Sequence, residues 1–192
     1  MKQTAARLVR HALESIGAEF TLGIPGVNNI ELYDQRKASE KILPVLVTHE
    51  GGAAFMADAI SRVGDSIGVL AIVPAPGITH AMSGIGEAYL EGVPLLVNSG
   101  GRRNDMGQKF QLHLVEEQAF VRPRTTGTFR IGRYEDAIPT IYEAYRTATG
   151  GEPGPVFVEL PANLQLLTGD VDDMPAYSPV AEPSSIDSAD VA

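Results

Sequence analysis

Residues 45–59 read V-L-V-T-H-E-G-G-A-A-F-M-A-D-A, and this stretch decides the fold that we expect. It contains an apolar strand over 44–47, a turn at His49, and a helical pattern over 50–63 that opens with Glu50. Open α/β sheets place their chemistry at the carboxyl ends of parallel strands, which is where Glu50 falls. A helix N-terminus favours the ionised carboxylate, whereas burial favours the neutral acid. Glu50 is therefore the first candidate catalytic residue; the simpler alternative is a carboxylate that only serves the helix N-terminus.

The 192 residues are 44% hydrophobic and 20% charged, which suits one globular domain with or without an appendage. The formal net charge of -9 at pH 7 argues against nucleic acid and against an anionic membrane surface as partners. There is no cysteine, so disulfide and thiolate chemistry are excluded. No segment has the apolar run of a secretory signal or the roughly 18 apolar residues of a membrane span. We therefore expect a cytoplasmic protein.

Strand-like and helix-like segments alternate along the chain. The strands are expected over 19–23, 44–47, 66–73, 94–99, 124–131 and 156–160, and the helices over 5–16, 28–37, 50–63, 79–90, 114–120 and 134–148. This alternation predicts an α/β fold, a doubly wound and mostly parallel six-stranded sheet with helices on both faces. We expect one domain over residues 1–168. Residues 169–192 are acidic, contain three prolines and four serines and lack Lys and Arg, which predicts a linker or disordered tail.

Three loops are expected to meet at the carboxyl edge of this sheet, because each directly follows a predicted strand. They are Ile24-Pro25-Gly26, Thr48-His49-Glu50 and Pro74-Ala75-Pro76-Gly77. Proline and glycine in such loops let a flat ligand approach the backbone closely, although ordinary strand-to-helix turns also use these residues. None of the loops has the spacing of a dinucleotide fingerprint or of a phosphate-binding P-loop. The run Gly84-Ile85-Gly86 lies inside a predicted helix, where close packing is the better explanation.

The chain has four histidines, and their spacing does not suit a metal site. His11 is expected on the surface of the first helix. His49, His80 and His113 each follow a strand or a loop, so they have access to one cleft, where imidazole suits proton transfer near neutral pH. There is no Gly-x-Ser-x-Gly, which argues against a serine hydrolase. We predict no metal ligand in this chain.

Four blocks together resemble thiamine diphosphate-dependent enzymes of the acetolactate synthase and benzoylformate decarboxylase type. Residues 48–59 are similar to R-H-E-x-x-A-x-x-M-A-x-G, and residues 74–97 to G-P-G-x-x-N-x-x-x-G followed by A and P. Leu22-Gly23-Ile24-Pro25-Gly26 is similar to F-G-x-P-G, and residues 151–161 to G-x-P-G-P-V-x-V-x-x-P. The blocks keep the order and spacing of the family and cover about residues 3–165. Each block alone is weak, whereas the set is specific.

This resemblance implies the N-terminal pyrimidine-binding (TPP-binding) domain of such an enzyme, with thiamine diphosphate as cofactor. In the family, the glutamate equivalent to Glu50 hydrogen-bonds N1′ of the cofactor's aminopyrimidine and thereby activates the cofactor. The resemblance gives the cofactor-binding residues as Pro25, Gly26, Glu50, Pro76 and Gly77.

The substrate-side candidates are His80, Phe110, Gln111 and His113. Phe110 and Gln111 match the Phe-Gln that faces the substrate in acetolactate synthases. Leu112 stands where a glutamate usually follows, and His80 stands where the family has asparagine. These departures bear on acetolactate synthesis itself and leave the cofactor contacts in place. The roles of His49, His80 and His113 in proton transfer stay open at this point.

The chain lacks the G-D-G…N motif with which the family binds diphosphate and magnesium on a separate domain. We therefore expect a domain of a 2-keto-acid decarboxylase or carboligase, a transferase or lyase, that is incomplete without a diphosphate-binding domain in cis or on a second chain. The tail resembles the family's linker, which favours an excised domain. A homodimer is expected, with Gly52, Ala53, Phe55 and Met56 facing the partner. The alternatives are the small subunit of a two-chain decarboxylase such as sulfopyruvate decarboxylase, and a non-catalytic regulatory or scaffolding domain.

Overall fold

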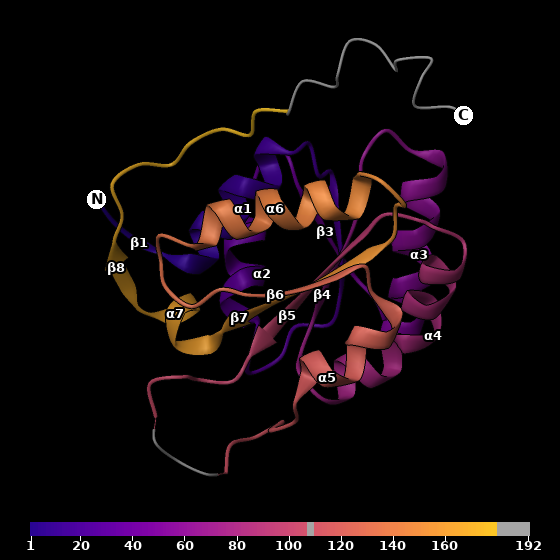
Figure 1. The fold of residues 1–192 in the computed structure, drawn as a ribbon. Coiled ribbons are helices and arrows are strands. Elements are labelled where there is room, and N and C mark those ends of the chain that lie inside the picture. The colour runs from indigo at the N-terminus through magenta and orange to yellow at the C-terminus, as the bar shows by residue number, and fades with distance from the viewer. Residues whose placement is uncertain (107–109, 180–192) are drawn as a thin grey trace, which may run out of the picture.

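The computed structural model describes residues 1–106 and 110–179 and shows a sheet covered by helices on both faces (Figure 1). Six strands form this sheet in the order β3-β2-β4-β5-β7-β6, and all neighbouring strands are parallel. The predicted α/β fold is thereby confirmed. The strands are β2 (Phe20–Gly23), β3 (Leu43–Leu46), β4 (Gly68–Ile72), β5 (Leu95–Gly101), β6 (Gly127–Arg130) and β7 (Pro155–Pro161).

Two apolar layers hold the helices on the sheet. Helices α1 (Ala5–Ser15), α2 (Ile30–Lys37) and α6 (Ala137–Thr149) cover one face, and α3 (Glu50–Val63) and α4 (Pro76–Leu90) cover the other (Figure 1). Strands β4, β5 and β7 are buried along their whole length, which explains their nearly continuous apolar sequence. Shorter helices complete the fold: α5 (Glu117–Val121), the 3-10 turn η1 (Arg122–Arg124) and α7 (Ala162–Leu166). In the described part of the chain, no helix is long and apolar enough to cross a bilayer.

A second, two-stranded sheet joins the two ends of the domain and was not predicted. Strand β1 (Lys2–Thr4) pairs antiparallel with β8 (Thr168–Asp170). Beyond β8, Val171 is buried, and the Tyr142 hydroxyl donates a hydrogen bond to the Pro175 carbonyl at 2.7 Å. Packing against the domain thus continues past residue 168, while residues 180–192 of the expected tail lie outside the described residues. Strands of three residues carry too short an alternation for a sequence pattern to predict them.

Several helix and strand ends differ from the predicted ones for local reasons. Helix α4 begins at Pro76 and not at Thr79, because proline suits the first position of a helix. Pro139 lies in the first turn of α6, where its missing N–H has no intrahelical partner to lose. The segment expected as a strand over 124–131 begins with the end of η1 and forms β6 only from Gly127.

Small residues let α3 and α4 pack unusually close to each other. A Cβ placed on Gly84 of α4 would lie 2.5 Å from the Cβ of Ala54 and 2.9 Å from that residue's carbonyl carbon in α3. Gly86, two residues further along α4, has nothing within 4 Å of the same position. The close approach therefore depends on Gly84, as the sequence suggested for this glycine pair in general.

Replacing Gly84 by Ala is expected to destabilise the chain by about 1–3 kcal/mol, because the added methyl overpacks a backbone contact between two helices. Gly86→Ala is the matched control: the same change in the same helix meets open space and is expected to stabilise by up to about 1 kcal/mol through helix propensity. Urea unfolding of the 192-residue chain measures both. Equal stabilities of the two variants would contradict the packing described for Gly84.

Candidate functional site

The candidate site lies where the order of the strands reverses. Strand β2 pairs with β3 on one side and with β4 on the other, so the chain changes direction across the sheet between β2 and β4. In open α/β sheets, ligands bind in the crevice outside the carboxyl ends of the strands at such a point. The two Pro-Gly bends, Pro25-Gly26 and Pro76-Gly77, follow β2 and β4 respectively. The topology thus places both at the crevice.

One side chain, Val73, packs against both bends. A Cβ on Gly26 would lie 2.7 Å from Val73 Cγ1, and a Cβ on Gly77 would lie 3.1 Å from Val73 Cγ2. Neither bend has room for a larger residue on this side. Immediately before Pro76, Ala75 has φ 56° and ψ −96°, a backbone conformation that is costly for a residue with a Cβ and that is often found at functional sites.

The first bend is held by an asparagine side chain. Asn29 Oδ1 accepts a hydrogen bond from the Gly26 backbone N–H at 2.7 Å, and its Nδ2 donates to the Ile24 carbonyl at 3.3 Å. Asn29 occupies the N-cap position of α2 but makes no side-chain capping bond to the helix. Its side chain therefore fixes the loop over 24–26 and does not serve as a helix cap.

Glu50 is the first residue of α3 and is buried at the same edge, with 6% of its surface exposed. Its Oε2 lies 3.1 Å from Nδ1 of His80, which is in the second turn of α4. His49 is the N-cap of α3: its Nδ1 accepts a hydrogen bond from the Gly51 N–H at 3.0 Å. The rings of His49 and His80 are stacked, with centroids 4.8 Å apart and planes 24° apart. The structure thus brings Glu50 together with two of the three predicted histidines.

Tyr33 of α2 belongs to the same edge and was not among the predicted site residues. Its hydroxyl donates a hydrogen bond to the Ala71 carbonyl of β4 at 2.9 Å. Burial raises the pKa of Tyr33 to about 12, against the opposing charge of Arg36, and the negative charge of Glu50 raises it further. Tyr33 therefore stays protonated at neutral pH. A tyrosine in a helical pattern gives no sequence signal for such a position, because the fold alone brings α2 against β4.

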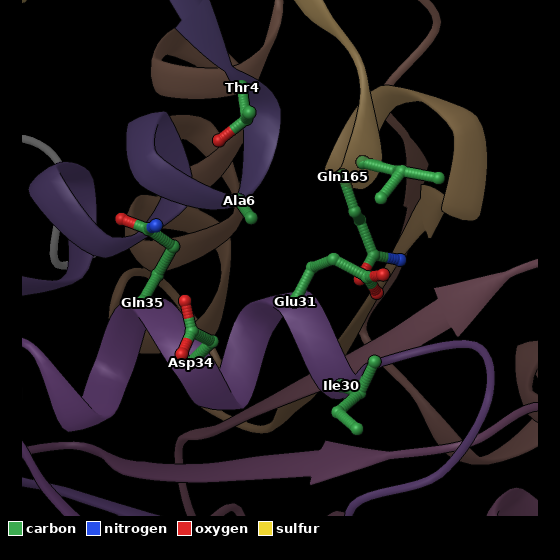
Figure 2. Close-up of a pocket in the computed structure, with 8 residues that line it drawn as sticks. Thr4, Ala6, Ile30, Glu31, Asp34, Gln35 and Gln165 are labelled. Carbon is green, nitrogen blue, oxygen red and sulfur yellow. The ribbon is translucent and has the colours of Figure 1, made fainter.

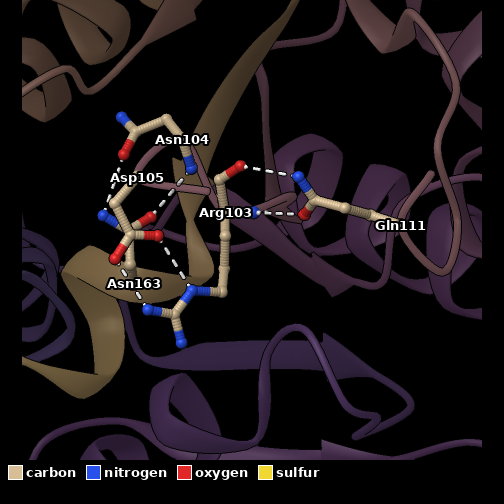
Figure 3. Close-up of polar contacts among 5 residues, drawn as sticks. All are labelled: Arg103, Asn104, Asp105, Gln111 and Asn163. Carbon is tan, nitrogen blue, oxygen red and sulfur yellow. Dashed lines mark hydrogen bonds and ion pairs between the residues drawn. The ribbon is translucent and has the colours of Figure 1, made fainter. Parts of the chain in front are cut away.

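Gln111, predicted to face the substrate, holds a loop by both ends of its amide (Figure 3). Its Oε1 accepts from the backbone N–H of Arg103 at 3.1 Å, and its Nε2 donates to the carbonyl of Arg103 at 3.1 Å. The Arg103 guanidinium pairs in turn with both carboxylate oxygens of Asp105, at 2.9 and 2.7 Å. Asn104 and Asn163 exchange two more hydrogen bonds, at 3.1 and 2.8 Å, which tie this loop to α7.

Among the predicted substrate-side residues, His80 contacts Glu50 directly. In the described structure, the others do not. The Phe110 side chain is 88% exposed. His113 has a left-handed backbone with φ 61°, and its buried Nδ1 has no hydrogen-bond partner within the described residues. A cavity of about 240 Å³ connects Gln111 with Val27 and Asn28, which follow the first Pro-Gly bend. Of the candidate substrate-side residues, His80 therefore contacts Glu50 and Gln111 lines this cavity, whereas Phe110 and His113 do neither in the described structure.

Further cavities lie beside α2 and do not include Glu50. One of about 330 Å³ is lined mostly by apolar groups, including Pro25, Tyr33 and Leu46. Another, of about 400 Å³, lies between α2 and residues of β1, α1 and α7 (Figure 2). It is lined by Thr4, Ala6, Ile30, Glu31, Asp34, Gln35, Gln165 and Leu166. Over residues 1–106 and 110–179, no group of three or more His, Asp or Glu side chains is arranged to hold a metal ion.

Another buried carboxyl group, on Glu117 of α5, was also missed by the sequence reasoning. Glu117 is 3% exposed, and its Oε1 accepts a hydrogen bond from the Ser99 hydroxyl at 2.9 Å. Burial raises its pKa from 4.5 to about 8, with Ser99 opposing the shift and Glu159 adding to it. Arg130 pairs with the buried Glu159 at 2.8 Å. Glu117 is therefore largely protonated at neutral pH, and it anchors the short helix that follows the Gln111 segment.

The Glu50 site suits the pyrimidine ring that the resemblance implies. Only one carboxyl oxygen, Oε2, has a hydrogen-bond partner in the described part of the chain, which leaves Oε1 for a ring nitrogen. The first bend is half-buried at Gly26, where a flat ring can approach the backbone closely, and Pro76 of the second bend is half-buried as well, whereas Gly77 is buried. A buried carboxyl group with one free oxygen is therefore the kind of group that the resemblance implies for binding a pyrimidine nitrogen.

Comparison with known proteins shows which family this chain belongs to. A profile described as "Thiamine pyrophosphate enzyme, N-terminal TPP binding domain" matches residues 3–120. The acetolactate synthase large subunit of Lactococcus lactis is 32% identical over 164 residues, which are 85% of this chain and 28% of that protein. The acetolactate synthase large subunit of Corynebacterium glutamicum is 29% identical over 189 residues, covering 95% and 30%. A "Probable 2-ketoarginine decarboxylase" of Pseudomonas aeruginosa is 33% identical over 164 residues, covering 84% and 29%.

The chain thus spans less than a third of the length of these relatives. The matched profile covers more than half of the chain and includes β2, β4 and the residues of the Glu50 site. The chain therefore belongs to the thiamine pyrophosphate enzymes, as a member carrying their N-terminal TPP binding domain.

Proposed function

We propose that this chain is the pyrimidine-binding domain of a thiamine diphosphate-dependent 2-keto-acid decarboxylase or carboligase, and that Glu50 is its catalytic residue. The observation that carries the proposal is the position of Glu50, a buried carboxyl at the carboxyl edge of the sheet that contacts His80 of α4, the helix that starts with the second Pro-Gly bend. Similarity to acetolactate synthase large subunits and to a 2-ketoarginine decarboxylase supports the reaction class. A substrate with a 2-keto acid group follows from that class.

In this proposal, different residues make different contacts with the cofactor. When bound, thiamine diphosphate supplies the carbon nucleophile for attack on a 2-keto group. Pro25, Gly26, Pro76 and Gly77 offer backbone against which the pyrimidine ring packs, and the rigid loop over 24–26 keeps that surface in place. Glu50 offers Oε1 to a ring nitrogen and holds the proton shared between them. In this proposal magnesium and the diphosphate group bind to another region of polypeptide, in cis or on a second chain.

A homodimer is part of the proposal, with the outer surface of α3 and α4 as the pairing face. Phe55 and Met56 are 49% and 45% exposed, and Tyr89 of α4 is 40% exposed, so large apolar side chains lie on this face. Gly52 is exposed as well. Ala53, which we expected on the same face, is completely buried against the sheet and does not contribute. The cytoplasmic location expected from the sequence stays a prediction.

Calorimetry with thiamine diphosphate and magnesium tests the proposal. The 192-residue chain alone is expected to bind the cofactor weakly, because it offers only the pyrimidine side. The same chain combined with a diphosphate-binding region is expected to bind it much more tightly and to release carbon dioxide from one or more 2-keto acids. The proposal fails if the combined protein binds no more tightly than the diphosphate-binding region alone.

A further inference from the structure

The carboxyl of Glu50 has one side-chain hydrogen-bond partner in the described part of the chain, and that partner is well exposed to solvent. The Glu50 side chain is 8% exposed, whereas the side chain of His80, 3.1 Å away, is 51% exposed. His80 therefore reaches from the carboxyl oxygen Oε2 to the surrounding water. An imidazole with one nitrogen on an acid and the other side open to solvent is suited to pass a proton between them.

The packing of the two helices fixes His80 in this place. Gly84 allows α4 to lie against α3, and a Cβ on Gly51 would lie 3.1 Å from the His80 carbonyl and 3.0 Å from His49 Nδ1. The stacked ring of His49 limits rotation of the His80 ring. His80 stands where the resembling enzymes have asparagine, and asparagine cannot exchange a proton with a carboxyl in this way.

The other titratable groups around Glu50 are committed elsewhere. His49 Nδ1 accepts the Gly51 N–H, so this nitrogen does not serve Glu50. Tyr33 donates its hydroxyl proton to the Ala71 carbonyl, and its pKa of about 12 keeps it protonated at neutral pH. Arg36, behind Tyr33, is fully buried and donates to Asn98 at 2.8 Å. Among the described residues, His80 alone contacts the Glu50 carboxyl through a side-chain hydrogen bond.

We propose that His80 is a positioning residue that exchanges a proton between solvent and Glu50, a role that rests on the function proposed above for Glu50. With Glu50 ionised, neutral His80 donates its Nδ1–H to Oε2. When Glu50 takes up a proton, the Nδ1–H bond breaks and an Oε2–H bond forms, while His80 Nε2 takes a proton from water. The ring is then neutral again in its other tautomer, and the hydrogen bond runs in the reverse direction. The reverse sequence returns the proton to water.

The tautomer of His80 tests the proposal without any cofactor. In ¹⁵N NMR spectra of the 192-residue chain at pH 8, assigned with His80→Asn, we expect the Nδ1–H form. Glu50→Ala removes the acceptor, and the ring should then shift toward Nε2–H; Glu50→Leu, which also lacks an acceptor but fills the same space, serves if the alanine variant does not fold. Asp58→Asn is the matched control, since it removes a buried acid from the same helix and leaves Glu50, His49 and His80 in place. An Nε2–H ring that is insensitive to position 50 would overturn the assignment.

The exchange rate of the cofactor's C2 proton tests the transfer itself, in the chain combined with a diphosphate-binding region. His80→Asn is expected to slow exchange by about 10-fold or more, and added imidazole should restore part of the rate. Asp58→Asn, which removes a buried acid from the same helix as Glu50 but one that pairs with Arg62, should stay near the wild-type rate. An unchanged rate in His80→Asn, or a slowed rate that imidazole does not restore, overturns the relay. If instead Glu50→Gln leaves exchange unchanged, the proposed function fails, while the tautomer measurement still decides the Glu50–His80 contact.

Discussion

Glu50→Gln is expected to slow exchange of the C2 proton of bound thiamine diphosphate by roughly 100-fold or more, the usual range for loss of a general acid or base. The physical reason is specific to the side chain. Glutamine has nearly the same shape and keeps an oxygen that accepts the His80 N–H, but it cannot hold or release a proton. The rate of deuterium incorporation at C2, followed by NMR after rapid quenching of the chain combined with a diphosphate-binding region, measures the effect.

Asp58→Asn is the control for this experiment. Asp58 also lies on α3 and is 6% exposed, but it pairs with Arg62 at 2.7 Å in the third turn and not at the carboxyl edge of the sheet. Its replacement removes a buried acid from the same helix and is expected to leave the exchange rate unchanged. A Glu50→Gln variant that exchanges C2 as fast as Asp58→Asn would remove Glu50 from the catalytic role.

Much of the fold was predictable because the strong sequence signals coincide with the buried strands. The apolar runs that became β4, β5 and β7 are buried on both faces of the sheet, so nearly every residue in them is apolar. The convergence of the Pro-Gly bends was predictable for a topological reason: loops that follow parallel strands all leave the sheet at one edge. Strands β1 and β8 were not predictable, because three residues paired across the whole chain leave no local pattern.

The polar contacts of the site were less predictable than its location. Glu50 and His80 are 30 residues apart and meet only because glycine lets α4 approach α3. Gln111 was assigned toward substrate from a two-residue match, whereas its amide holds the backbone of Arg103. The direction in which a long polar side chain turns depends on donors and acceptors brought by distant segments. A sequence pattern can therefore predict the segment that carries such a side chain, but it cannot predict the side chain's hydrogen-bond partners.

Glu116 and Glu117 show the same limit, since two adjacent acids with the same local sequence context have opposite environments. The side chain of Glu116 is 59% exposed, whereas Glu117 is buried against Ser99 and close to Glu159. Only the docking of α5 on β5 and β7 decides which of the two is desolvated. The buried member has a large and testable effect on the stability of the domain.

Glu117→Gln is expected to remove a loss of stability that the wild-type chain suffers as the pH rises. Because the pKa of Glu117 is raised from 4.5 to about 8, the folded state binds more protons than the unfolded state between these values. The free energy of unfolding therefore falls as the pH rises through this window, by up to about 1.4 kcal/mol per pH unit from this group. Across the window we expect a loss of about 2–4 kcal/mol from Glu117, less than the full shift because the structure relaxes around the ionised carboxyl.

The measurement is urea unfolding of the wild type and of Glu117→Gln at several pH values from 5 to 9. Glutamine has the shape of the protonated acid and accepts the same Ser99 hydroxyl, so the two proteins should have similar stability at pH 5. The variant should become the more stable one as the pH rises, because the wild type then has to ionise a buried carboxyl or keep it protonated against the solvent. Glu116→Gln, one residue away and exposed, should follow the wild type throughout. Parallel curves for wild type and Glu117→Gln would mean that the carboxyl is ionised in the fold already at pH 5, and that the Arg130 charge outweighs burial at this position.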